Sequence, residues 1–161
     1  MPEPLRLALD ALTALPPALW LRRSGTLYLL VNAVHIGAIG LLIGSIVPLD
    51  LRLLGVLKPT SLALLAPVLA RTAAVGLALA ILTGATLFTV RAQEYLENPA
   101  FVVKMGLLGA GLINAWLVRR SGAWGQVLQG GPASTALRCQ AAVSLLLWTG
   151  CLVAGRWIGF L

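Results

Sequence analysis

The sequence has little charge. Asp, Glu, Lys and Arg together make up 11% of its 161 residues, whereas 59% are hydrophobic, and the mean hydropathy is +0.93. Soluble domains carry roughly 25% charged residues, so this composition excludes an ordinary soluble globular domain. It predicts an integral membrane protein that forms one domain.

Acidic residues are scarcer than basic ones, with 5 against 12 and a formal net charge of +7. A basic chain could bind nucleic acid, but here the basic residues form no dense run. They stand at the ends of apolar segments, where Lys and Arg side chains meet lipid headgroups. The pattern therefore argues against nucleic acid as a partner and indicates a lipid bilayer.

Cysteine and histidine are almost absent. Cys139 and Cys151 lie twelve residues apart on one predicted helix, about 18 Å along its axis, which is too far for a disulfide within the chain. His35 is the single histidine. Copper or zinc normally takes several His, Cys or carboxylate ligands, and a two-histidine cytochrome b centre is excluded within one chain. The CxxC, HExxH and phosphate-loop motifs are also missing.

Long apolar runs are what the sequence does contain. A membrane-spanning helix needs about 17–25 predominantly apolar residues, and four such spans are predicted, at residues 26–49, 72–90, 99–118 and 139–155. We therefore expect an all-α fold, an integral membrane bundle of four transmembrane helices formed by residues 26–161. Gly40 and Gly44 form a small-xxx-small pair on the first span, which lets another backbone approach closely.

Residues 1–25 precede the first span. Leu5, Leu9 and Leu12 share one helical face, and Arg6 and Asp10 lie off it, which predicts a short amphipathic interfacial helix on the membrane surface. We expect Pro16-Pro17 to end this helix.

Polar segments connect the predicted spans. Lys58-Pro59-Thr60-Ser61 should break the chain, Ser61–Ala70 should lie at the interface, and residues 91–98 should form a polar turn. Asn98-Pro99 is a typical helix start, with Asn as the cap and Pro in the first position. Residues 121–134, rich in Gly, are expected to form a loop.

The strongly polar side chains of the spans gather in one half of the membrane. Asn32 and His35 lie three positions apart on the first span, and so on one face of that helix. The first and third spans run in the same direction, so Lys104, early in the third span, reaches a similar depth. The turn before the third span brings Arg91 to the same surface. Topology therefore predicts a site formed by Asn32, His35, Lys104 and Arg91.

An imidazole below two cations suits a flat apolar ligand with acidic edges. Haem fits this description, with His35 as the ligand of the iron and with Lys104 and Arg91 binding the propionates. Simpler interpretations stay open: Asn32 and His35 can bond a neighbouring helix, and Lys104 can extend to the headgroups. Asn114 on the third span is expected to bond between helices rather than to bind a ligand.

Three segments carry a resemblance to known proteins: AVHIGAIGLLIGSIVPLDLRLLG, LTGATLF and NPAFVVKMGLLGAGLINA. Over residues 26–118 the chain resembles a family of uncharacterised bacterial four-helix membrane proteins. More distantly it is similar to HemJ-type protoporphyrinogen oxidases and CopD-type copper-resistance membrane proteins. The resemblance implies His35 as a haem b ligand, Lys104 as a partner in the same pocket, and Arg52 as the arginine that follows the first span. It also implies a multi-pass protein of the bacterial inner (cytoplasmic) membrane.

The leading hypothesis is therefore a haem-b-binding membrane protein in a redox or quinone-linked process, as a subunit of a larger complex or as a homo-oligomer. Two alternatives remain: a metal transport or homeostasis protein of the copper-resistance type, with His35 as the metal ligand, and a non-catalytic membrane anchor in which His35 is structural. The sequence does not decide whether the protein is an enzyme.

Overall fold

The computed structural model describes residues 3–57 and 61–160, and over these ranges it is all-helical, without strands. Four helices are long and apolar enough to cross a membrane: α3 (Gly25–Leu53), α4 (Leu62–Phe88), α6 (Pro99–Arg120) and α8 (Thr135–Trp157). The predicted fold class is confirmed. The short elements are α1 (Glu3–Thr13), α2 (Pro16–Arg23), α5 (Ala92–Glu97), α7 (Gly122–Leu128) and the 3-10 turn η1 (Ile158–Phe160).

Polar caps begin three of the long helices. The Ser24 hydroxyl accepts a hydrogen bond from the Leu27 backbone N–H before α3, and Ser134 does the same for Leu137 before α8. Asn98 caps α6 by accepting from Ala100 and Phe101, and Pro99 stands in the first position, as the sequence predicts. Each cap supplies an acceptor for N–H groups that have no partner inside the helix.

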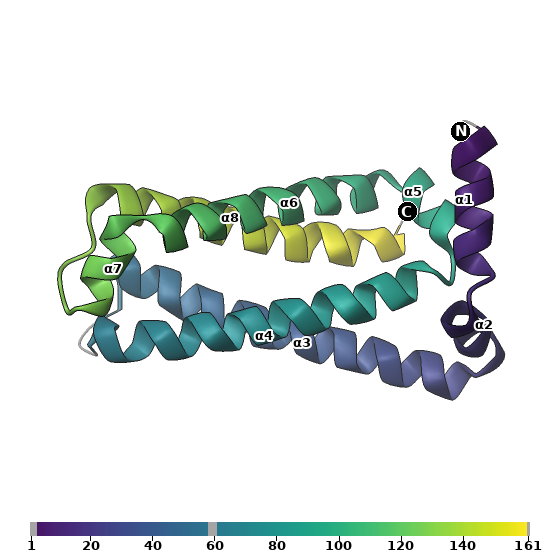
Figure 1. Ribbon diagram of the computed structural model, residues 1–161, viewed down its shortest axis with the longest axis horizontal. Helices are drawn as coiled ribbons and strands as arrows, with labels where there is room; N and C mark the ends of the chain where they lie inside the picture. The colour runs from purple at the N-terminus through teal and green to yellow at the C-terminus, as the bar shows by residue number, and fades with distance from the viewer. Residues whose placement is uncertain (1–2, 58–60, 161) are drawn as a thin grey trace.

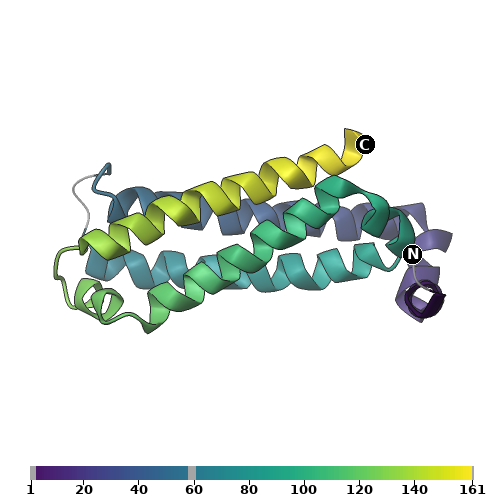
Figure 2. The ribbon, with the colours of Figure 1, turned by 90° about the horizontal axis from the view of Figure 1, so that it is seen from above.

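The long helices pack as two pairs, α3 with α4 and α6 with α8, and the pairs meet mainly where α8 contacts α3. Figures 1 and 2 show the pairs side by side along the bundle. The backbones of α4 and α6 do not form a comparable contact along their lengths. The bundle is therefore closely packed on its α3–α8 side and more open between α4 and α6.

Gly76 lets α4 approach α3 closely. A Cβ atom at this position would lie 2.7 Å from the Leu42 backbone nitrogen and 2.9 Å from the Ala38 carbonyl oxygen, which is closer than such atoms can come. The small residues on α3 behave differently, because a Cβ at Gly40 or Gly44 would meet nothing within 4 Å. The predicted small-xxx-small pair therefore lies on an exposed face of α3 and takes no part in packing within the chain.

Short helices close the two ends of the bundle. α1 lies across the long axis at the end that holds both termini (Figure 1), which is the orientation of a helix lying in the plane of a membrane. Arg22 on α2 donates from Nε (3.0 Å) and Nη2 (2.5 Å) to the Val90 carbonyl, which ties α2 to the end of α4. α7 covers the opposite end, where Val127 packs in a buried apolar cluster with Leu53 and Leu137.

Several connections differ from the sequence-based expectation. Pro16 begins α2 rather than only ending α1, since proline is well suited to the first turn of a helix. Ser61–Ala70 is not a separate segment: α4 starts at Leu62 and continues through Pro67. The expected turn at 91–98 and loop at 121–134 contain the short helices α5 and α7. The break predicted at Lys58-Pro59-Thr60 lies outside the described residues.

Candidate functional site

His35 lies in the first half of α3, half-buried against α4. Its Nδ1 is 2.8 Å from the hydroxyl oxygen of Thr83. That hydroxyl has one proton, which it donates to the Leu79 carbonyl at 2.6 Å. The hydroxyl oxygen is therefore the acceptor and His35 Nδ1–H is the donor, so in the neutral imidazole Nε2 carries the lone pair.

Gly84 makes room for the imidazole. A Cβ atom at Gly84 would lie 3.0 Å from His35 Cε1, which is tighter than ordinary van der Waals contact. The ring therefore rests on the bare backbone of α4, one residue after the threonine that holds Nδ1. His35 thus bonds the neighbouring helix through Nδ1, which is one of the interpretations that the sequence left open.

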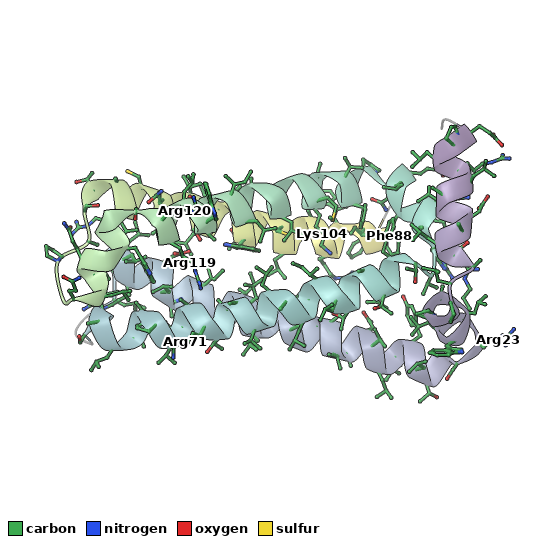
Figure 3. All side chains as sticks on the ribbon, in the orientation of Figure 1. Arg23, Arg71, Phe88, Lys104, Arg119 and Arg120 are labelled. Carbon is green, nitrogen blue, oxygen red and sulfur yellow. The ribbon has the colours of Figure 1, made fainter. Side chains whose placement is uncertain are left out.

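Lys104 approaches the site from the other helix pair (Figure 3). Its chain passes Gly155 on α8, where a Cβ would be 3.5 Å from Lys104 Cδ and Cε and 3.7 Å from Nζ. The Cys151 thiol donates to the Lys104 carbonyl at 3.8 Å. The ammonium lies close enough to His35 to act electrostatically on the imidazole. The structure thus brings His35 and Lys104 into one half of the bundle.

Three aromatic rings close the outer end of this region. The Phe88 ring on α4 stacks on Phe101 of α6 with centroids 5.5 Å apart, and Tyr95 of α5 lies 5.3 Å from Phe101. Burial raises the pKa of the Tyr95 hydroxyl, and the neighbouring Tyr28 adds to that shift. α4 and α6 are therefore bridged by rings at this end, one turn beyond Gly84 and Lys104.

The other predicted site residues lie further out. Asn32 is half-buried on α3, one turn before His35. Arg91 is exposed and pairs with Glu94, with Nη1 and Oε2 3.3 Å apart. Arg52 lies seventeen residues after His35 on the same helix, which places it about 25 Å away. The structure therefore groups His35 with Lys104 and nearby Asn32, and it leaves Arg91 at the surface and Arg52 at the opposite end.

A site for a bare metal ion lacks further ligands. Among the residues that the structure describes, no group of three or more His, Cys, Asp and Glu side chains could hold a metal ion. His35 alone is a sufficient protein ligand only for a metal that brings most of its own coordination sphere, as haem iron does.

Sequence reasoning missed a second polar site, around Asp50 near the end of α3. Asp50 is 5% exposed and bonds to the Ser144 hydroxyl of α8. Nearby, Asn114 Nδ2 donates to the Gln140 carbonyl at 3.1 Å, which is the interhelical bond predicted for Asn114. The sequence did hold a signal, because Asp50 is the only carboxylate within the four long apolar helices. Its position directly after the predicted span 26–49 is, however, typical of a residue at the membrane edge.

The chain belongs to DUF6644, a family of unknown function, whose model matches residues 21–161 and so includes all four long helices. No curated protein and no solved structure matches the chain. Similarity to HemJ-type or CopD-type proteins is not shown. Any function must therefore be argued from the two polar sites.

Proposed function

We propose that this protein binds haem b through His35 and takes part in a redox process in the bacterial inner membrane. The observation that carries the proposal is the hydrogen bond from His35 Nδ1 to Thr83. Histidines that ligate metals almost always donate their other N–H to a neighbouring acceptor, which fixes the tautomer and the ring orientation. His35 is held in this way, with Nε2 as the basic nitrogen.

The position of His35 sets where a planar group would bind. Gly84 on α4 accommodates the imidazole, and beside it the α4 and α6 backbones do not pack closely. A haem held by His35 would lie between these helices, below the rings of Phe88 and Phe101. Haem, when bound, supplies one-electron chemistry at its iron.

The cations of the site supply one partner for a propionate. Lys104 lies within electrostatic range of His35, and its ammonium would pair with a carboxylate at the edge of the macrocycle. Arg91 already pairs with Glu94 at the surface, so it would have to exchange that partner to contribute. A sixth ligand to iron would come from water or from another subunit, since the sequence holds no second histidine.

Absorption spectroscopy tests the proposal. The purified full-length chain in detergent, reconstituted with haem, should show a Soret band that His35→Ala abolishes. Ile36→Ala is the matched control, because the neighbouring Ile36 is 61% exposed and lies off the site. A protein that takes up no haem, or binds it equally well after His35→Ala, would rule out the proposal. The role of His35 would then be structural, through its hydrogen bond to Thr83.

A further inference from the structure

A cavity of about 170 Å³ lies in the half of the bundle that α7 covers. Residues of all four long helices line it, together with Trp124 of α7, and most of its wall is apolar. Trp148 forms a rigid part of this wall, since its indole packs on Gly111 of α6, where a Cβ would lie 3.2 Å from the ring. The polar side chains that face the cavity are Asp50, Asn114, Ser144 and, at its edge, Arg119.

The Asp50 carboxyl group is incompletely bonded. Ser144 is its hydrogen-bond partner, but the buried Oδ2 atom has no partner within the described part of the chain. Ionisable groups inside a membrane protein are costly and typically mark a functional site. A buried oxygen without a partner, facing a cavity, calls for a ligand that carries a hydrogen-bonding group.

The cavity opens sideways. Its exposed lining residues include Ala74 on α4 and Arg119 on α6, the two helices whose backbones do not pack closely. The Arg119 Nη2 atom on α6 donates to the Ala70 carbonyl of α4 at 3.1 Å, and Figure 3 shows where Arg119 lies. A ligand would therefore enter from the side of the bundle, between α4 and α6.

We propose that this cavity binds the ring of a membrane-soluble quinol or quinone. An apolar cavity of about 150 Å³ holds one benzene ring, so the volume of 170 Å³ suits a single substituted ring. A quinol hydroxyl would donate to Asp50 when the carboxyl is ionised. A quinone carbonyl would accept from it when the carboxyl is protonated. The isoprenoid tail would leave through the opening between α4 and α6.

The proposal covers binding and no electron transfer. The choice of a quinone, which is a lipid-soluble electron carrier, rests on the redox function proposed above. The cavity that would bind it is separate from the His35 site. Asp50 lies fifteen residues further along α3, about 22 Å away. An acyl chain could also enter from the bilayer, but it carries no group that would bond Asp50 Oδ2.

Calorimetric titration of the haem-free, full-length protein in detergent with a short-tailed benzoquinone and its quinol tests the inference. We expect saturable binding that Asp50→Leu weakens about 10-fold or more, the usual effect of losing a hydrogen bond to a charged group. Ala74→Leu should also weaken binding by narrowing the opening. Ala78→Leu, one turn further on the exposed side of α4 and outside the cavity lining, should leave it unchanged.

Three results would overturn the inference: no binding by the wild-type protein, unchanged affinity in both Asp50→Leu and Ala74→Leu, or equal competition by an alkane of the same tail length. The last result would identify an acyl-chain site. Ring binding in a protein that never takes up haem would remove the function proposed for His35 and leave this inference standing. Haem uptake without Asp50-dependent ring binding would overturn this inference and leave the function proposed for His35 standing.

Discussion

The two polar sites of the bundle differ in how the fold satisfies their titratable side chains. His35 bonds to Thr83 on the next long helix along the chain, within the closely packed α3–α4 pair. Asp50 takes its partner Ser144 from α8, about ninety residues later in the sequence, and one of its oxygens stays unpartnered among the described residues. One site is thus built within a helix pair and the other between pairs.

Because of this difference, the two sites suit two different kinds of ligand. An imidazole whose Nδ1 is already bonded offers one nitrogen in a fixed direction, which suits coordination to a metal. A carboxyl group with an unpartnered oxygen beside an apolar cavity suits a ligand that forms a hydrogen bond. The same helix, α3, presents both groups, so its contact with α4 should affect both sites.

Gly76→Ala should have the largest effect, because Gly76 lies between the two sites at the α3–α4 contact. The added methyl would collide with backbone atoms of Leu42 and Ala38 at 2.7 and 2.9 Å, which cannot rotate away as a side chain can. We expect a loss of about 3 kcal/mol in unfolding free energy, at the upper end of the usual cost of overpacking. Thermal unfolding in detergent measures it.

The control for Gly76 is Gly40→Ala on the exposed face of α3, where a Cβ meets nothing within 4 Å. Its effect should stay within about 0.5 kcal/mol. Equal losses in the two variants would show that the α3–α4 contact is not what holds the two sites in place.

Asp50→Leu should raise stability while it removes ring binding. A buried polar atom without a partner costs about 1–3 kcal/mol, so replacing the carboxyl with an apolar side chain should increase the unfolding free energy by about 2 kcal/mol. Ser144 can turn its hydroxyl to a carbonyl of its own helix, as Ser45 does with Leu41. A marked loss of stability would mean that Asp50 is a structural residue.

The fold was predictable from the sequence because spans are set by local composition. Four apolar runs bounded by polar turns specify four helices without knowledge of which helix packs on which. The approach of His35 and Lys104 followed in part from topology, since parallel spans place residues at similar depths. Arg91 shows the limit of that argument: it has the right depth, but its side chain pairs with Glu94 at the surface.

The Asp50 site could not be predicted in the same way. Its burial depends on contacts of α3 with α8 and on the cover that α7 and Trp124 provide, and neither follows from composition. The sequence shows one carboxylate near the end of an apolar run, and such a residue usually extends to the headgroups. Only the rotation of α3 in the bundle turns it inward.

Thr83→Val should weaken the His35 site more than it weakens the fold. Loss of the hydroxyl leaves Nδ1–H without its acceptor, which we expect to cost about 1 kcal/mol of stability and about 10–100-fold in haem affinity, the usual effect of removing such a supporting bond. Thr86→Val is the matched control, because the Thr86 hydroxyl donates to the Leu82 carbonyl of its own helix. Equal haem affinity in both variants would contradict the assigned role of Thr83.

Asn114→Leu should have the smallest effect and tests whether the two sites are independent. It removes the bond to the Gln140 carbonyl, and interhelical hydrogen bonds in membrane proteins average about 0.6 kcal/mol. Asn114 lies ten residues after Lys104 on α6, about 15 Å along the helix, so the Soret band should not change.

The double variant Thr83→Val with Asn114→Leu completes this test. Substitutions more than about 10 Å apart without shared partners usually add within about 0.5 kcal/mol, so the two losses of stability should sum. A larger deviation would mean that the α3–α4 and α6–α8 pairs transmit strain to each other. In that case occupancy of the cavity near Asp50 should also change haem binding at His35, and the two sites would have to be treated as one coupled system.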